Sequence, residues 1–575
     1  MSLSHRNFVL ACLSFLGITF LSLGQNPADM PMRQVISGAQ ELIGAGDYGT
    51  AAPYLDQLEI RFADEANPEV EKILEQFGFV RGVGYIQNYA KTGDMANMQK
   101  AADAFGKFVD KYPNNENAVN AMKERTTCLR ALQKWEEAAD VIETLLDEDK
   151  PFKKKIQKRS DLLNLYHGRA QCYHIKQNWS KGEKAFAELL KFSDIAKDED
   201  RSAYAVSCMV EMHIQTGNVD KVFPLLPRLS GETPARYDLR LNVNLMQGAE
   251  ILKASERHVE ASLLFALTMT TEEIVNFYTA REKTFSKEIE IIEKFIAEQG
   301  SRLPSRRKAG LKDKINALAM KATTARSHLK LAEGTNSFTT VLRWRKADNF
   351  QACKREWESF WAFYWLHNDF PSHENVENFL YAAFASANTV KYREKSIELG
   401  EAYLENKELK KFRADVTFIM ANAYRQEAQN QLTVAEQLQT SLATIDKEKA
   451  ADAKEKARAY YDRFFELCDD FLAVMPEHKY ARDFIGMMGA EFFKGRQFDK
   501  LLQKFAGFEN GVMNPQLGYI NDPALNGTPA MGTAHYMSGL ALLATGNFKE
   551  AQPLLGAVVG VSLDGLPLDE KALEE

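Results

Sequence analysis

The sequence contains few cysteines, and their spacing gives them no obvious structural or metal-binding role. Six are present in 575 residues, and no CxxC or CxxH pattern occurs. Zinc sites need such closely spaced ligands, and disulfide frameworks are typical of small secreted domains with an even set. Cys128, Cys172 and Cys208 lie on helical patterns among apolar residues, where a free thiol behaves as a small hydrophobic residue. We therefore expect buried thiols and no metal.

The motifs of several large enzyme classes are also missing. The sequence has no GxxxxGK[ST], HExxH or GxSxG motif. One GxGxxG string occurs at 44–49, but residues 35–43 read as a helix, whereas a dinucleotide site follows a strand. His167 and His174 lie two helical turns apart, about 10 Å along the axis, which is too far to share one ion. The sequence predicts no enzymatic activity, no catalytic residues and no cofactor.

Neither sign of charge is in large excess. The net charge is −7, from 72 basic and 79 acidic side chains. A nucleic-acid partner would require a concentrated basic face, and an anionic membrane surface would require a polybasic segment. The overall balance indicates neither, and the basic cluster at 153–159 is interpreted as a solvated helix face. Disorder is excluded because 45% of residues are hydrophobic and 11% are aromatic.

Long apolar runs are absent after Gln25, and one lies before it. Residues 8–23 are apolar or small, and Ser22-Leu23-Gly24 precedes a polar stretch. This order is typical of an export signal, here 1–24 with cleavage after Gly24. An uncleaved anchor is the alternative, although the run is short for the ~20 residues of a membrane-spanning helix. We expect an exported protein, periplasmic or envelope-associated, with no membrane span after cleavage.

A helical-hairpin pattern recurs along the chain. An aromatic residue at a turn precedes a small or apolar residue by three positions, and further apolar residues follow. One copy reads Gly539, Leu542, Gly546, Phe548, Ala551, Leu555 and Val558, another Ala170, Tyr173, Trp179, Gly182, Phe186 and Leu189, and a third Gly489, Phe492, Phe498, Leu501 and Phe505. Small residues such as Ala51, Ala138 and Ala551 would allow two helices to approach, and aromatics such as Tyr48, Trp135, Trp179 and Phe548 would fill the turn.

This spacing resembles the tetratricopeptide repeat (TPR), whose ~34-residue unit is a pair of antiparallel helices. The resemblance covers most of the chain after the signal, and in composition the chain is similar to exported bacterial envelope members of the family. It implies an all-α protein, a right-handed α-solenoid of TPR-like hairpins that binds protein partners.

Two longer helical hairpins interrupt the predicted repeats. Residues 285–296 and 311–329 carry apolar residues at helical spacing on either side of Leu303-Pro304. The predicted organisation is a signal at 1–24, a TPR-like array at 25–274, a long hairpin and linker at 275–337, a second array at 338–424, a long charged hairpin at 425–475, C-terminal repeats at 476–560 with an irregular loop at 506–531, and a tail at 561–575. The loop is either disordered or functional.

Trp357, Trp361 and Trp365 form the sharpest candidate site. Their spacing places the three indoles on one stripe of a helix. One interpretation is a packed seam between helices, and the other is a surface that receives a partner helix or peptide. The sequence thus predicts a non-enzymatic protein-interaction scaffold of the cell envelope. The alternative is a binder of a small ligand or polysaccharide that uses these tryptophans.

Overall fold

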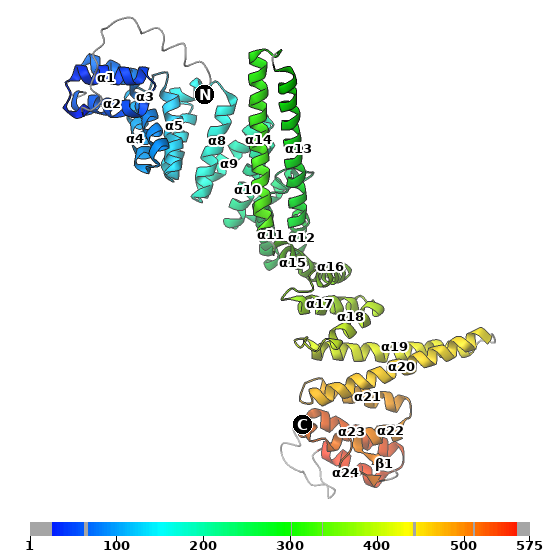
Figure 1. The fold of residues 1–575 in the computed structure, drawn as a ribbon. Coiled ribbons are helices and arrows are strands. Elements are labelled where there is room, and N and C mark those ends of the chain that lie inside the picture. Colours follow the sequence, from blue (N-terminus) through cyan, green and yellow to red (C-terminus); the bar gives the residue numbers. More distant parts are fainter. Residues whose placement is uncertain are drawn as a thin grey trace. The chain divides into compact units, whose positions relative to one another are not determined.

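The protein is built almost entirely of helices. The structure, a computed structural model, describes residues 26–62, 67–300, 302–335, 337–440, 444–509 and 512–559, so the predicted signal and tail lie outside the described residues. Within those ranges the chain forms 24 α-helices and one small antiparallel pair, β1 (Phe508–Glu509) with β2 (Val512–Met513). The all-α prediction is confirmed, and this pair is a local exception to it. The chain divides into two compact units, Met1–Thr339 and Thr340–Glu575 (Figure 1).

The first unit contains six two-helix hairpins and one long hairpin. The six are α1 (Met32–Gly44) with α2 (Tyr48–Phe62), α3 (Pro68–Thr92) with α4 (Met95–Lys111), α5 (Ala118–Ala131) with α6 (Trp135–Leu146), α8 (Arg159–Ile175) with α9 (Trp179–Ala196), α10 (Glu199–Gln215) with the 3₁₀ segment η5 (Val219–Leu229), and α11 (Leu239–Ala254) with α12 (His258–Leu267). The segment η3 (Pro27–Asp29) precedes them, and the short α7 (Pro151–Lys155) lies between α6 and α8. In η5 the second helix is not α-helical because Pro224 and Pro227 remove backbone donors.

The long hairpin of the first unit pairs α13 (Thr271–Gln299) with α14 (Ser305–Glu333). The second unit pairs α15 (Phe338–Ala352) with α16 (Glu356–Asp369), α17 (Val376–Thr389) with α18 (Arg393–Glu405), the long α19 (Arg413–Gln439) with α20 (Thr444–Val474), α21 (Ala481–Lys494) with α22 (Phe498–Ala506), and α23 (Pro529–Ala544) with α24 (Phe548–Val558). Both long hairpins of the predicted fold are present. The helix α19 begins ahead of the expected residue 425 because Val416, Met420 and Tyr424 continue one buried face.

The same turn closes nine of these hairpins. In each, one residue adopts a left-handed conformation, and the N–H of the next residue bonds to a carbonyl five residues earlier. This is the Schellman arrangement, which satisfies carbonyls at the end of a helix. The left-handed residues are Gly46, Gln133, Gln177, Gly217, Glu256, Lys354, Lys391, Arg496 and Gly546. The GxGxxG string at 44–49 is therefore a hairpin turn, as predicted.

The helices of a hairpin approach closely where their residues are small. Ala51, Ala138 and Ala551 are fully buried, and a Cβ at Gly539 on α23 would lie 2.6 Å from the side chain of Leu555 on α24. Successive hairpins also approach closely, since a Cβ at Gly84 on α3 would lie 2.1 Å from the carbonyl oxygen of Tyr48 on α2. From Gln133 to Glu256 in the first unit, equivalent turns follow one another at intervals of about 40 residues, longer than the ~34 residues of a TPR unit. The predicted solenoid of TPR-like hairpins is confirmed as a fold, with longer repeats.

One of the aromatic residues that were expected to pack against a hairpin turn, Phe548, remains exposed. The side chain of Phe548 is 67% exposed, whereas Tyr48, Trp135 and Trp179 are half-buried. Since α24 is the last described helix, no described hairpin follows to cover Phe548. Burial of the aromatic residue at this position therefore depends on the presence of a following hairpin.

The irregular segment 506–531 is packed in its described part. It contains η6 (Tyr519–Asn521) and η7 (Pro523–Leu525), with Ile520 and Leu525 buried. The Tyr519 hydroxyl donates to Asp469 on α20. Gly507 and Gly518 have positive φ, and their backbones approach so closely that a side chain on either would clash. This segment completes the core of the last repeats.

Candidate functional site: the tryptophan stripe

The helix α16 has two aromatic faces. One face is buried, with Phe360, Phe363 and Leu366 at most 2% exposed. On the other, Trp357, Trp361 and Trp365 are 48%, 37% and 56% exposed, respectively. We call these three residues the tryptophan stripe. Large apolar side chains of a helix are normally turned to the core, so the stripe is an apolar surface that the described residues cover only in part.

The rings of the stripe stand as a ridge. The ring centroids of Trp361 and Trp365 are 5.7 Å apart, and the two rings are inclined by 32°. The ring centroids of Trp357 and Tyr392 are also 5.7 Å apart. Tyr392 caps the start of α18, and Lys395 on α18 places its Nζ 5.4 Å from the ring centroid of Tyr364. The stripe therefore extends along α16 and borders the beginning of α18.

The charges near α16 are satisfied by one another. Arg355 pairs with Glu358 at 2.6 Å, Lys395 with Glu398 at 2.7 Å, and Arg343 with Asp369 at 2.7 Å. A partner would therefore gain mainly from burying indole surface and little from new ion pairs. The sequence placed these indoles on one stripe, and the structure shows that the described helices leave them partly open to solvent, so they do not form a fully packed seam.

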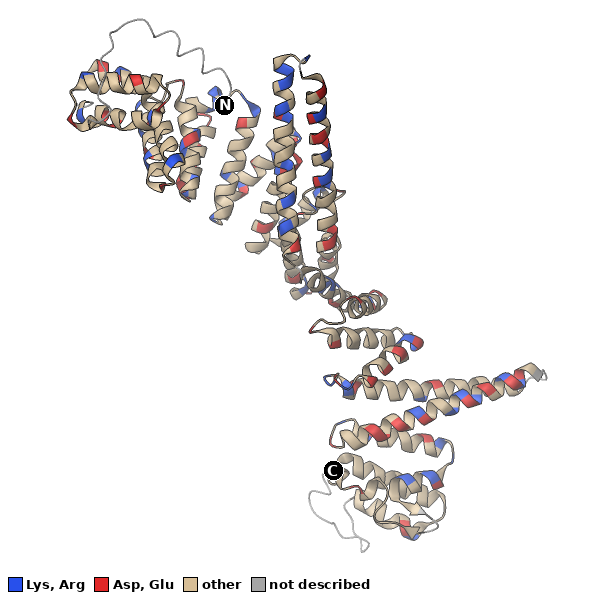
Figure 2. Cartoon of the chain, viewed as in Figure 1, with Lys and Arg blue, Asp and Glu red and all other residues tan. Residues whose placement is uncertain are grey.

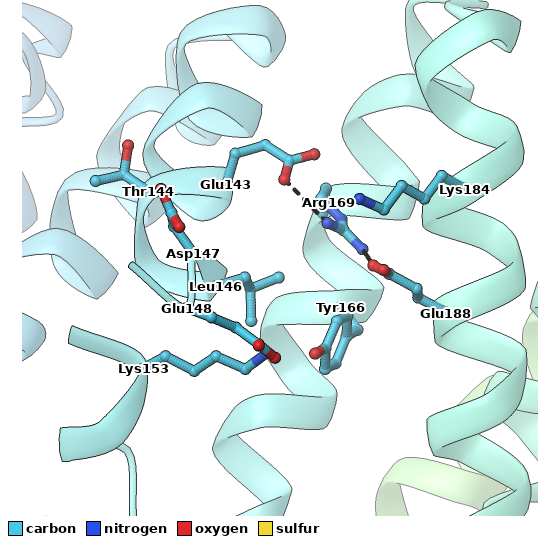
Figure 3. Close-up of a pocket in the computed structure, with 10 residues that line it drawn as sticks. All are labelled: Glu143, Thr144, Leu146, Asp147, Glu148, Lys153, Tyr166, Arg169, Lys184 and Glu188. Atoms are coloured by element: carbon cyan, nitrogen blue, oxygen red, sulfur yellow. Dashed lines mark hydrogen bonds and ion pairs between the residues drawn. The ribbon is translucent and has the colours of Figure 1, made fainter. Parts of the chain in front are cut away.

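A separate polar cavity lies between hairpins of the first unit. Its volume is about 480 Å³, and its lining comes from α6, α7, α8, α9 and the residues that follow α6 (Figure 3). Ligand cavities of this size are usually lined mainly by apolar and aromatic groups. Seven of the ten residues here are charged: Glu143, Asp147, Glu148, Lys153, Arg169, Lys184 and Glu188.

Most of the positive charge in this cavity is already paired. Arg169 is 3% exposed and donates to Glu143 at 3.0 Å and also to Glu188. Lys153 donates to Glu148 at 2.9 Å, although the sequence pattern placed it on a solvated face. The cavity is thus a paired ionic contact between hairpins and offers little to a small apolar ligand. Its lining comes from four segments, which is why no local sequence pattern indicated it.

The other sequence candidates are dispersed. His167 and His174 each contact Tyr204, at ring-centroid distances of 5.0 and 6.0 Å. In the described part of the chain, no cluster of three or more His, Cys, Asp or Glu side chains could hold a metal ion. Cys128, Cys172, Cys208 and Cys468 are buried free thiols, as expected, and burial raises the pKa of Cys172 to about 11.

Among the helices described, no stretch is both long enough and apolar enough to cross a bilayer.

Comparison with known proteins gives similarity at the level of solved structures. No protein-family model matches the chain, and no curated protein matches it. A structure of Naa15/Naa10 bound to HypK-THB is 13% identical, with 94% of this chain and 98% of that chain covered and a TM-score of 0.25. The APC/C hetero-tetramer Cut9-Hcn1 is 13% identical, with 92% and 98% covered and a TM-score of 0.22.

A monomeric mutant of IFIT1 with m7Gppp-AAAA is 12% identical, with 76% of this chain and 90% of that chain covered and a TM-score of 0.18. Identities this low concern the fold alone, and TM-scores this low carry no argument about partner or function.

Proposed function

We propose that this protein is a non-enzymatic interaction scaffold whose tryptophan stripe binds an amphipathic helix of a partner protein. The observation that carries the proposal is the second aromatic face of α16, where the described residues leave each of the three indoles 37–56% exposed. Tryptophan is enriched among the residues that dominate binding energy at interfaces. Contiguous exposed apolar surface marks interaction sites more often than isolated exposed side chains do.

The geometry of the stripe favours a helix over a glycan. A polysaccharide stacks on rings that lie flat and coplanar, but Trp361 and Trp365 are tilted by 32° and too close together to lie side by side in one plane. Residues at i, i+4 and i+8 instead form a ridge, and such ridges pack into the grooves of a second helix. Glycan binding is the alternative, and the same stripe would carry it.

We also propose that the chain is exported and acts in the cell envelope. The supporting feature is the apolar N-terminal segment that ends in Ser22-Leu23-Gly24. Mass spectrometry of the purified natural protein tests this proposal. A mature chain that begins at Gln25 is expected, and a chain that retains residues 1–24 in the cytoplasm would contradict it.

The stripe is tested by comparing three forms of the chain in affinity capture from envelope extract. The double variant Trp361→Ala/Trp365→Ala is expected to bind a stoichiometric protein partner about 1,000-fold more weakly, since each truncation of a hot-spot residue costs about 2 kcal/mol and the variant has two. The matched control is Val474→Ala, which removes an apolar side chain that is 72% exposed elsewhere in the same unit. The control is expected to bind like the natural chain.

Two results would contradict the proposal. Equal capture of a protein partner by the Trp variant and the control would remove the stripe from the interface. Retention of the natural chain on glycan, lost in the Trp variant, would establish the alternative. Acrylamide quenching gives an independent check, since fluorescence from the stripe is expected to be quenched readily in the free chain and protected in the complex.

A further inference from the structure

The long hairpin of the first unit separates its charges between its two helices. The helix α14 carries eight basic and two acidic side chains, whereas α13 carries seven acidic and four basic ones. Figure 2 shows the basic residues along α14 and the acidic ones along α13. The nearly balanced charge of the whole chain hides this separation, so the sequence-wide expectation of no polybasic segment does not hold locally.

The positive charge is most concentrated at the end of the hairpin where the chain passes from α13 to α14. Residues 299–312 contain no acidic side chain. They contain five basic ones, Arg302, Arg306, Arg307, Lys308 and Lys312, which we call the basic tip. Farther from the connection between α13 and α14, charges on the two helices form ion pairs, as in Arg326 with Glu282 at 2.8 Å and Lys314 with Glu288 at 3.9 Å. None of the five residues of the basic tip has an ion pair with a described residue.

Folding of the hairpin does not explain this cluster. The first turn of α14 holds no acidic residue, although the positive end of the helix dipole favours acidic side chains there and disfavours basic ones. Neighbouring like charges repel each other as well. Side chains that destabilise the local structure, as these basic residues do, are expected mainly at positions that serve binding.

Apolar groups accompany the basic tip. Leu303 and Pro304 connect the two helices between Arg302 and Arg306. On α13, Phe295 and Ile291 lie within about two turns of the tip and are 38% and 58% exposed. Basic side chains together with exposed apolar ones are typical of segments that bind the interface of an anionic membrane.

A nucleic acid fits the basic tip less well. Single-stranded nucleic acids are held by aromatic rings among the cations, and duplexes require many phosphate contacts along an extended surface. Residues 299–312 contain no aromatic residue, the ring of Phe295 lies about a turn before them on α13, and the cations gather at the end of a hairpin. We propose that the basic tip of the α13–α14 hairpin binds the anionic headgroups of a phospholipid bilayer.

This proposal is tested by sedimentation with vesicles of phosphatidylcholine that contain about one third phosphatidylglycerol. The chain is used from Gln25 onward because residues 8–23 would partition into lipid by themselves, and this form keeps every described helix. Each cation near the surface contributes about 1 kcal/mol, roughly a fivefold change in affinity. The variant Arg302→Gln/Arg306→Gln/Arg307→Gln is therefore expected to bind about 100-fold more weakly. Binding is also expected to weaken steeply with added salt.

The second long hairpin supplies a matched control. In α20 the basic residues Lys447, Lys449 and Lys454 alternate with acidic ones, including Glu448, Asp452 and Glu455. The variant Lys447→Gln/Lys449→Gln/Lys454→Gln removes the same charge from the same kind of hairpin. It is expected to bind the vesicles as tightly as the natural chain.

Three outcomes would overturn the proposal. The first is equal binding by the two triple variants, and the second is equal binding to pure phosphatidylcholine vesicles. The third is no binding to anionic vesicles by a chain whose basic tip binds an acidic polypeptide or RNA instead. Equal circular dichroism and melting of the three chains shows that a loss of binding is not a loss of folding. The tryptophan stripe is in the other unit, so Trp361→Ala/Trp365→Ala is expected to leave vesicle binding unchanged.

Discussion

The two units stack similar hairpins but differ in the cations that they bury between them. The first unit buries charged residues, with Arg81 and Arg169 at 3% exposure and Asp238 at 8%. Both units bury aromatic rings, such as Phe105 and Phe186 in the first. The second unit has no buried arginine among its described residues, although the side chain of Glu491 is only 7% exposed. Its fully buried aromatic residues are Phe360, Phe379, Phe384, Tyr403, Phe464, Phe484 and Phe505, with Phe471 at 2% exposure.

The buried arginines repeat one contact. Each lies on the first helix of a hairpin and pairs with a carboxylate on the preceding hairpin, Arg81 with Glu59 at 2.7 Å and Arg169 with Glu143 at 3.0 Å. A tyrosine four residues later donates to a carboxylate of the same preceding helix, as Tyr173 does to Glu143 at 3.0 Å. The first unit therefore places a buried guanidinium in its hairpin contacts, whereas the second unit uses partly exposed cations, such as Arg463 with Glu401 at 2.7 Å.

The largest expected effect is in the aromatic core. Phe384→Ala should destabilise the second unit by about 4 kcal/mol, because the ring is fully buried and the cavity cannot collapse completely. Hydrogen exchange measured by mass spectrometry should show faster opening in peptides of the second unit. Phe384→Leu, which refills most of the volume, should show a much smaller change. Equal loss of protection in the first unit would contradict the division into two units.

Arg169→Ala should destabilise the first unit by about 3 kcal/mol, because it removes a buried guanidinium with its packing and leaves the partly exposed carboxylates of Glu143 and Glu188 without their shared partner. Urea unfolding followed at both units measures the effect. The triple variant Arg169→Met/Glu143→Gln/Glu188→Gln removes all three charges and should recover most of the loss. If the triple variant is less stable than Arg169→Ala, the pairing explanation is wrong.

The first unit should also depend on pH through His167. Burial, together with the nearby cations Arg201 and Arg130, lowers the pKa of His167 to about 4. Between that value and the unfolded value of about 6.5, the unfolded chain binds a proton that the folded chain does not. Stability is therefore fully present above about pH 6.5 and falls as the pH falls, by about 2–3 kcal/mol at pH 4.5. Urea unfolding at about pH 6.5 and at pH 4.5 measures this loss of stability. The variant His167→Phe should lose this part of the pH dependence of stability, and an unchanged pH dependence would show that His167 does not cause it.

The smallest effect should be common to both units because they share a turn. Gln133→Gly in the first unit and Lys391→Gly in the second should each stabilise by about 1 kcal/mol, since only glycine adopts a left-handed conformation without strain. Thermal unfolding measures the gain. Lys191→Gly, in the interior of α9, should instead cost about 1 kcal/mol. Destabilisation by both turn variants would show that the turn is not the shared element.

The hairpins were readable from the sequence because their signals are local. Apolar residues at helical spacing, the small residues Ala51 and Ala138, and the Pro304 break all act within a few turns of helix. The left-handed turn was harder to read, since Gln133 and Lys391 stand where glycine is usual. The 3₁₀ form of η5 depends on two prolines whose effect becomes clear only in the folded hairpin.

The candidate sites also combine features that the sequence shows locally with features that only the folded structure shows. The spacing of Trp357, Trp361 and Trp365 placed three indoles on one stripe, but whether a neighbour covers that stripe depends on helices far away in the sequence. The basic tip is a continuous segment flanked by Glu298 and Asp313, but only the folded hairpin shows that its five cations form no ion pair with a described carboxylate. The cavity at Arg169 has no local signal because residues from four segments line it.

The amino-acid order alone therefore specified an all-helical chain of hairpins, because helix formation, turns and close helix contacts depend on residues near one another. Packing between successive hairpins decided which of those side chains became core and which stayed on the surface. The reason is that burial and ion pairing depend on distances between segments that the chain brings together only when it folds.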